Sequence, residues 1–160
     1  LGHRRIATIA GPPARTTGRE RLDGFLSAMA SAGLSVPERY VRQGGFQEEP
    51  AGQAMAALLE MPDAPTAVFV ANNSMMAGAF AAIRERAARV PGDLSIVSFD
   101  DVQWARYVDP PLTVVAQAAD LIGSWAAELA FRRLSGEDTP VRRVLDPVLI
   151  VRGSTAAPRA

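Results

Sequence analysis

The segment SIVSFDDVQWARYVDPPLTVVAQ, residues 95–117, decides how the rest of the chain is interpreted. It has the pattern of a buried strand that ends at Asp100 and Asp101, followed by a loop, a Pro-Pro stop and a second buried strand that ends at Gln117. In an open parallel sheet, ligands bind outside the carboxyl ends of the strands. We therefore expect these polar side chains at one edge of a sheet. With no nucleophile beside them, they indicate a site that holds a polar molecule.

Strand and helix patterns alternate along the remainder of the chain. Strands are expected at residues 5–10, 39–42, 66–71, 95–99 and 112–116, and helices at residues 19–32, 48–61, 74–89 and 118–134. Short connections between alternating strands and helices predict an α/β fold, a parallel sheet with helices on both faces. Two further strand pieces, 141–145 and 148–151, are expected around Pro147, and the tail from Ser154 is expected to fray.

The composition excludes several classes of chemistry. The chain has no Cys, so disulfides, thiolate zinc sites and Cys nucleophiles are excluded. All 17 basic residues are Arg, so a Walker A lysine and Schiff-base chemistry are excluded as well. The single His is His3, and no G-x-S-x-G elbow exists for it to serve. We expect no enzyme activity, no catalytic residue, no metal site and no cofactor.

Charge and hydropathy narrow the choice of partners. The net charge is zero and the Arg residues are scattered, so no basic stripe for nucleic acid is present in these 160 residues. No apolar run approaches the roughly 20 residues of a membrane span. The start, LGHRRIATIAG, lacks an initiator Met and the regions of a signal peptide, which suggests a fragment.

Several segments together resemble one family. They are LGHRRIATIAGP, RERLDGF, PTAVFVANNSMMAGA, VPGDLSIVSFDD, PPLTVVAQ and LIVRGST. In order and spacing they are similar to the lactose-repressor (LacI/GalR) family of bacterial transcription regulators, over essentially the whole chain. That resemblance implies a two-lobed, periplasmic-binding-protein-like effector domain behind a DNA-binding headpiece. Residues 1–111 would form most of the C-terminal lobe, 112–140 a crossover and a helix of the N-terminal lobe, and 141–160 the return strands and tail. The headpiece and most of the N-terminal lobe would be absent.

The resemblance also assigns ligand-binding roles. Arg21 matches a cleft position whose planar guanidinium suits hydroxyls or a carboxylate, and otherwise it is a solvated residue in the first turn of a helix. Asn72 and Asp100 match two strand-end positions, with a helix cap and a turn residue as the respective alternatives. Gln117 matches the amide at the crossover, and the alternative is a plain strand-end residue. Phe46, judged from its position after Gly44-Gly45, either stacks on a sugar ring or anchors the loop.

Three positions depart from the family pattern and leave the effector open. Asn73 stands where the family usually has Asp, Ser98 where Gly is common, and Ala116 where a basic residue is frequent. An acid–base dyad of Asp100 with Asp101 is disfavoured, because neighbouring strand residues point to opposite faces. Trp104 is open between ligand, partner and core.

The functional hypothesis is a sensing domain of a cytoplasmic regulator. A small polar effector, expected to be a sugar, would bind between the lobes and shift the affinity of the full-length protein for operator DNA, which it contacts through the missing headpiece. By resemblance we expect a homodimer that uses the helix 74–89 and the loop 105–109, with no membrane association. The alternative from another class is a periplasmic sugar-binding receptor, because fold alone does not separate the two. The helix 118–134 should expose Leu121, Ile122, Trp125 or Leu129.

Overall fold

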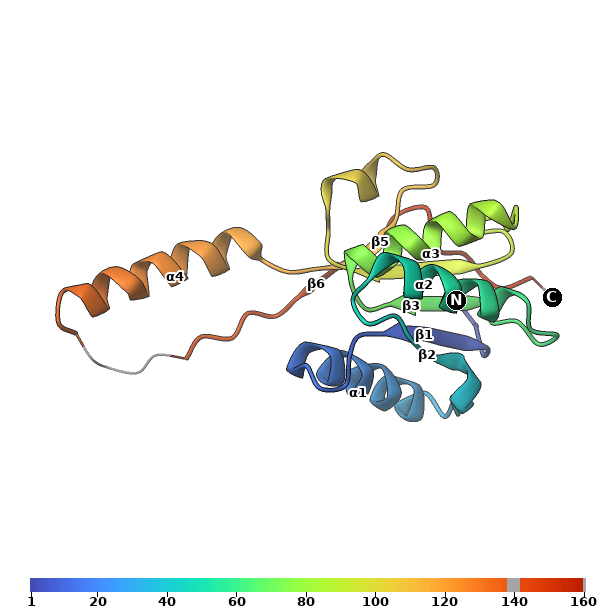
Figure 1. Cartoon of the computed structure of the whole chain (residues 1–160), viewed down its shortest axis with the longest axis horizontal. Helices are drawn as coiled ribbons and strands as arrows, with labels where there is room; N and C mark the ends of the chain where they lie inside the picture. Colours follow the sequence, from blue (N-terminus) through green and yellow to red (C-terminus); the bar gives the residue numbers. More distant parts are fainter. Residues whose placement is uncertain (138–141, 160) are drawn as a thin grey trace.

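A computed structural model describes residues 1–137 and 142–159 of the chain. Its centre is a six-stranded sheet with the order β2-β1-β3-β4-β5-β6 (Figure 1). The first five strands in the chain run parallel, and β6 pairs antiparallel to β5. The strands are β1 Ile6–Ala10, β2 Val41–Gln43, β3 Ala67–Val70, β4 Ser95–Phe99, β5 Thr113–Ala116 and β6 Val148–Ile150. The expected α/β architecture is confirmed, apart from the direction of the last strand.

Helices cover both faces of the sheet. The covering helices are α1 Thr16–Ser31, α2 Glu48–Leu59 and α3 Asn73–Glu85, and a fourth helix, α4, spans Ala119–Leu134. The chain moves from β1 to β2 in one direction along the sheet and from β2 through β3 to β4 in the other. Right-handed crossovers therefore place α1 on one face and α2 with α3 on the opposite face (Figure 1). No helix in the described part of the chain is long and apolar enough to cross a membrane.

The core lies between the sheet and the α2–α3 pair. Ile9, Val70 and Ile96 from three adjacent strands are fully buried. Helices α2 and α3 contribute large buried side chains to the same cluster, namely Met55, Leu58, Met75, Met76 and Ile83. This packing fixes the strands whose carboxyl ends carry the polar residues singled out above.

Some boundaries differ from expectation for local reasons. Helix α1 begins at Thr16, and α3 ends at Glu85, shortly before Ala87 adopts a left-handed backbone with φ 53°. Residues 142–145 form no strand, so the strand expected at 141–145 is wrong over that part, and Val141 lies outside the described residues.

Helix α4 leaves the sheet and projects away from it (Figure 1). No residue of α4 is buried, and Leu121 and Ile122 are 48% and 47% exposed, as expected. Trp125 is partly covered, because the guanidinium of Arg143 lies 4.6 Å from its ring centroid. The assignment of this helix to another lobe stays a prediction.

The expectation that the tail frays from Ser154 is wrong over residues 154–156, which bond to other segments, and Ala160 lies outside the described residues. Ser154 is fully buried and its hydroxyl donates to the Ile96 carbonyl at 2.7 Å. The same oxygen accepts from the Thr113 amide at 2.8 Å. Further along, the Ala156 carbonyl lies 2.7 Å from Nε2 of His3. Buried polar groups are almost always paired, and here the tail supplies partners that the strand ends would otherwise lack.

Candidate functional site

Asn72, Asp100 and Gln117 lie beyond the carboxyl ends of β3, β4 and β5, at the edge where they were expected. Asp100 has φ 79°, and its amide donates to the Val115 carbonyl at 2.9 Å. This backbone conformation is unusual for a residue other than Gly. It turns the chain at the strand end, where Nε2 of Gln117 donates to Oδ1 of Asp100 at 2.6 Å. Two side chains that are 17 residues apart in sequence are thus brought together.

Arg21 reaches the same edge from α1. It is half-buried, and one guanidinium nitrogen donates to the Ala71 carbonyl at 2.6 Å, directly before Asn72. The guanidinium carbon lies 3.6 Å from the ring centroid of Phe99, an arrangement stabilised by the ring quadrupole. Burial lowers the pKa of Arg21, and the nearby charge of Asp100 opposes that shift. Arg stays protonated at any physiological pH, so the edge holds a fixed cation beside a carboxylate.

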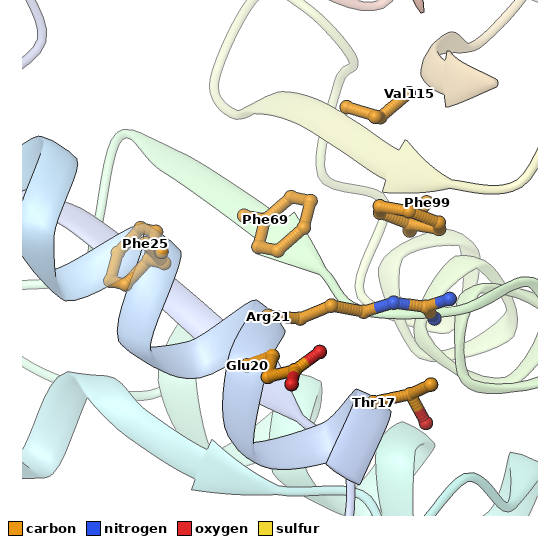
Figure 2. A pocket seen from close by; sticks show the side chains of 8 residues that line it. Thr17, Glu20, Arg21, Phe25, Phe69, Phe99 and Val115 are labelled. Atoms are coloured by element: carbon orange, nitrogen blue, oxygen red, sulfur yellow. The ribbon is translucent and has the colours of Figure 1, made fainter. Parts of the chain in front are cut away.

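A cavity of about 510 Å³ opens beside Arg21, between α1 and the sheet (Figure 2). The rings of Phe25 and Phe69 stack on its wall with centroids 6.2 Å apart. The complete lining is Thr17, Glu20, Arg21, Gly24, Phe25, Phe69, Phe99 and Val115. Apolar walls with a few polar groups are typical of small-molecule sites.

Asn72 is the N-cap of α3, since its Oδ1 accepts from the Met75 amide at 2.9 Å. This is the helix-cap alternative for Asn72, and it is compatible with ligand binding through the amide nitrogen. Asn73 makes a local bond, in which its Oδ1 accepts from the Ser74 amide at 2.8 Å.

Phe46 lies in the loop between β2 and α2. Its φ is 62°, and its ring packs on Gly11, where a Cβ would lie 2.0 Å from a ring carbon. The residue is partly buried against the core. The structure therefore places it as a loop anchor at the end of β1, and its contact with a sugar ring stays a prediction.

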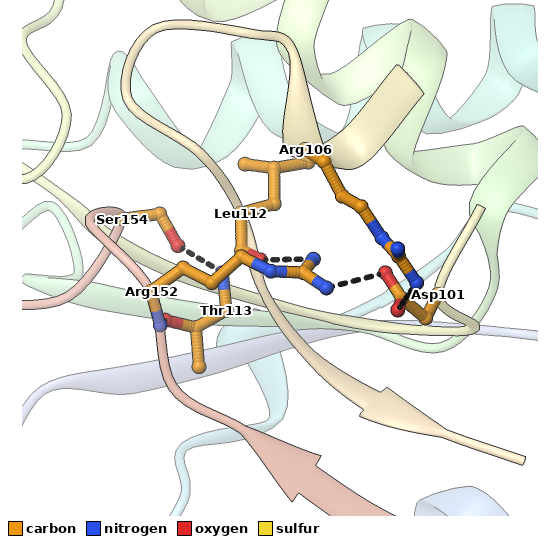
Figure 3. Close-up of polar contacts among 6 residues, drawn as sticks. All are labelled: Asp101, Arg106, Leu112, Thr113, Arg152 and Ser154. Carbon is orange, nitrogen blue, oxygen red and sulfur yellow. Dashed lines mark hydrogen bonds and ion pairs between the residues drawn. The ribbon is translucent and has the colours of Figure 1, made fainter. Parts of the chain in front are cut away.

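Asp101 takes different partners from Asp100. Its two oxygens accept from Arg152 at 2.8 Å and Arg106 at 2.7 Å (Figure 3). Burial acts to raise the pKa of Asp101, but the hydrogen bonds from Arg106 and Arg152 bring it below its ordinary value. A carboxylate held ionised between two cations is not a general acid, so the geometry does not support the acid–base dyad.

Several residues of this edge were not predicted. Phe99, Phe25 and Phe69 line the cavity, although their sequence pattern only indicated buried positions. Phe99 directly precedes Asp100, and that adjacency was the available signal. Within residues 1–137 and 142–159, no group of three or more His, Cys, Asp or Glu side chains is placed to hold a metal ion.

The chain is similar to several proteins of known role. Residues 1–155 match the model of the periplasmic binding protein-like domain. The HTH-type transcriptional repressor CytR of Escherichia coli K12 is 38% identical over 157 residues, 98% of this chain and 46% of the relative. The ribose operon repressor of the same strain is 37% identical, over 96% of this chain and 47% of the relative. The chain thus spans about half the length of the curated relatives it matches.

Solved structures agree with the sequence relatives. A complex of the transcriptional regulator CelR with cellobiose has a TM-score of 0.88 and 42% identity, over 96% of this chain and 47% of that chain. The lac repressor dimer bound to operator and the anti-inducer ONPF has a TM-score of 0.86 and 31% identity, over 98% of this chain and 54% of that chain.

Proposed function

Because the chain belongs to the lactose-repressor (LacI/GalR) family, within its periplasmic-binding-protein-like domain, we propose that it is the effector-sensing part of a transcriptional regulator. The effector is a small polar molecule, with a sugar as the favoured class. Binding changes the affinity of the full-length protein for operator DNA. Relatives that are named as repressors support this role over that of a periplasmic transport receptor.

One observation carries the proposal, the convergence of Arg21, Asp100 and Gln117 at the carboxyl edge of the sheet. An Arg fork, a carboxylate and an amide offer fixed donors and acceptors to adjacent hydroxyl groups. Asp100 and Gln117 bond to each other through Oδ1 and Nε2. A polyol would exchange that contact for its own hydroxyls. Asn72, which follows β3, and Phe46, which follows β2, complete the proposed ligand set.

Closure of two lobes on the effector would supply the switch. A coupling free energy of about 1–3 kcal/mol between effector and operator is sufficient for such a switch. In this scheme α4 packs on the N-terminal lobe, which covers its exposed Leu121 and Ile122. The headpiece carries the operator contact, and the protein acts in the cytoplasm as a homodimer. No turnover of the effector is part of the proposal.

Dimerisation is assigned to the outer surface of α3 and the nearby 105–109 loop. A groove of about 590 Å³ runs between α2 and α3, lined in part by Gly52, Ala81 and Glu85. The two helices pack closely beside this groove, since a Cβ at Gly52 would lie 3.2 Å from the Gly78 carbonyl oxygen.

A thermal-shift titration of the full-length protein tests the binding site. Cellobiose and D-ribose are the first probes, chosen from the structures and relatives described above. We expect a saturable rise in Tm for a ligand of this class, and its loss in Arg21→Ala and Asp100→Ala. Arg19→Ala and Asp23→Ala, exposed positions on the same helix, are the matched controls and should respond like the wild type. A response that survives both site variants would contradict the assignment.

A further inference from the structure

Asp101 sits between two arginines that differ sharply in environment. The side chain of Asp101 is 9% exposed, that of Arg152 14%, and that of Arg106 59%. Both ion pairs are short, at 2.8 Å for Arg152 and 2.7 Å for Arg106. Water screens the exposed pair, so its contribution is small, whereas the pair with Arg152 is largely shielded.

Arg152 also bonds outside this ion pair. Its Nη1 donates to the Leu112 carbonyl at 2.9 Å, while Nη2 donates to Asp101 (Figure 3). Its backbone amide donates to the Thr113 hydroxyl at 2.9 Å. One residue thus joins three segments: the turn after β4, the start of β5 and the chain that leaves β6. The planar guanidinium can make two such bonds in fixed directions, which an ammonium cannot reproduce.

The tail behind Arg152 fixes it in place. Ser154 is buried and bonded to both the Ile96 carbonyl and the Thr113 amide, and the Ile96 amide donates to the Ser154 carbonyl at 2.8 Å. On the C-terminal side of Arg152, the backbone is therefore fixed by the hydrogen bonds of Ser154 to Ile96 and Thr113. On its N-terminal side, Ile150 pairs with Val114 in the sheet.

Arg152 binds Asp101 in the turn after β4, and the preceding residue of that turn is Asp100. Asp100 keeps a left-handed backbone, which is unfavourable for a residue other than Gly and persists only when its surroundings hold it. Three contacts hold it in this conformation. The Asp100 amide donates a hydrogen bond to the Val115 carbonyl, and the Asp100 side chain accepts one from Gln117. The next residue, Asp101, is itself bonded to Arg152.

We propose that Arg152 is a positioning residue for the ligand site: through Asp101 and the Leu112 carbonyl it holds the Asp100–Asp101 turn at the carboxyl edge of the sheet. This rests on the proposed function as far as Asp100 is a ligand contact. The segment that returns from α4 through β6 thereby sets the geometry of a residue at the end of β4. Arg106, bound to the same carboxylate from an exposed position, does not perform this role.

Hydrogen exchange tests the positioning without any ligand. The variant is Arg152→Met, which keeps much of the packed volume, and the matched control is Arg106→Met, which removes the other partner of Asp101. In Arg152→Met, we expect amides of residues 100–106 to exchange roughly tenfold faster or more, with β1 and β3 amides within about twofold of wild type. Arg106→Met should leave both sets within about twofold.

Other exchange patterns would overturn the proposal. If both variants accelerate exchange at residues 100–106 equally, the two cations beside Asp101 act alike and Arg152 has no special positioning role. A uniform acceleration that includes β1 and β3 would show a global stability effect only. If Arg152→Met does not fold, Arg152→Lys serves instead. It keeps the charge but puts a single ammonium nitrogen in place of the two guanidinium nitrogens that bond Leu112 and Asp101, so it should loosen the turn while leaving β1 unchanged.

A second measurement separates this proposal from the proposed function. Cellobiose and D-ribose are titrated into full-length wild type, Arg152→Met and Arg106→Met. For a sugar that binds wild type, we expect roughly tenfold weaker affinity in Arg152→Met and less than twofold in Arg106→Met. Unchanged affinity alongside a loosened turn would remove the functional part of the role. Failure of wild type to bind either sugar counts against the sugar assignment, and the exchange result still decides whether Arg152 holds the turn.

Discussion

Replacing Ser154 with Ala should destabilise the protein far more than a serine near the C-terminus would suggest. The Ser154 hydroxyl is fully buried, donates to the Ile96 carbonyl at 2.7 Å and accepts from the Thr113 amide at 2.8 Å. Ala keeps the shape of the backbone and removes both bonds. The amide of Thr113 and the carbonyl of Ile96 then lose a partner in a site closed to water.

The magnitude follows from those two groups. Leaving a buried donor or acceptor unsatisfied costs about 1–3 kcal/mol. The backbone bond from the Ile96 amide to the Ser154 carbonyl remains, so the segment stays in place and relaxes little. The sum for two groups is about 2–6 kcal/mol, and we expect the lower part, about 2–3 kcal/mol in the free energy of unfolding, because a carbonyl has two lone pairs and tolerates the loss of one partner better than an amide. At about 2–4 °C per kcal/mol for a chain of this size, Tm falls by roughly 4–12 °C.

Urea unfolding followed by circular dichroism measures this difference. The matched control is Ser135→Ala, whose hydroxyl donates to the Phe131 carbonyl at 3.0 Å on the exposed end of α4. That variant should stay within about 0.5 kcal/mol of wild type. If Ser154→Ala is no less stable than Ser135→Ala, the tail does not complete the bonds of the strand ends, and the reasoning fails.

Three further changes test the fold and the site edge. Gly78→Ala would put a Cβ 1.9 Å from the backbone oxygen of Glu48, so we expect the free energy of unfolding, measured in urea, to fall by about 1–3 kcal/mol. Gly24→Ala, which has open space on α1, should be neutral or stabilising. Equal effects of the two variants would contradict the close packing of α2 and α3. Asn72→Ala removes the N-cap of α3 and should cost about 0.5–2 kcal/mol in the same assay, and an unchanged midpoint would rule out that cap. The pKa of Asp101 in the folded protein lies below its ordinary 3.8, so the ionised carboxylate stabilises the fold above that pH, and this stabilisation is lost as the pH falls through the folded pKa. The loss of unfolding free energy in Asp101→Asn should therefore be full at pH 7 and shrink below about pH 4. A loss that does not depend on pH would refute the ion-pair explanation.

Much of the fold could be predicted from local patterns. The strand Ser95–Phe99 has the predicted bounds, and α2 begins at Glu48 as predicted. Apolar periodicity and Pro or Gly stops are local signals, so they locate elements well. The same logic placed Asp100 and Gln117 at one edge, because strands that run parallel end together.

Other features depend on segments that are distant in sequence. The sequence showed a strand near Val148 but not that it pairs antiparallel to β5. It also gave no sign that Arg152 would meet Asp101, 51 residues away. The packing of whole segments decides which polar side chains become hydrogen-bond partners, and amino-acid composition does not encode that packing.

The amino-acid sequence by itself therefore determined the alternation of strands and helices and the strand ends that carry the polar side chains. Only the tertiary structure decided that Ser154 is buried, that the Phe46 ring packs on Gly11, and that Asp101 pairs with Arg152 of the returning chain. The physical reason is one of range. Backbone propensity and hydrophobic periodicity act over a few residues, whereas the satisfaction of buried polar groups is settled between segments that meet only in the folded chain.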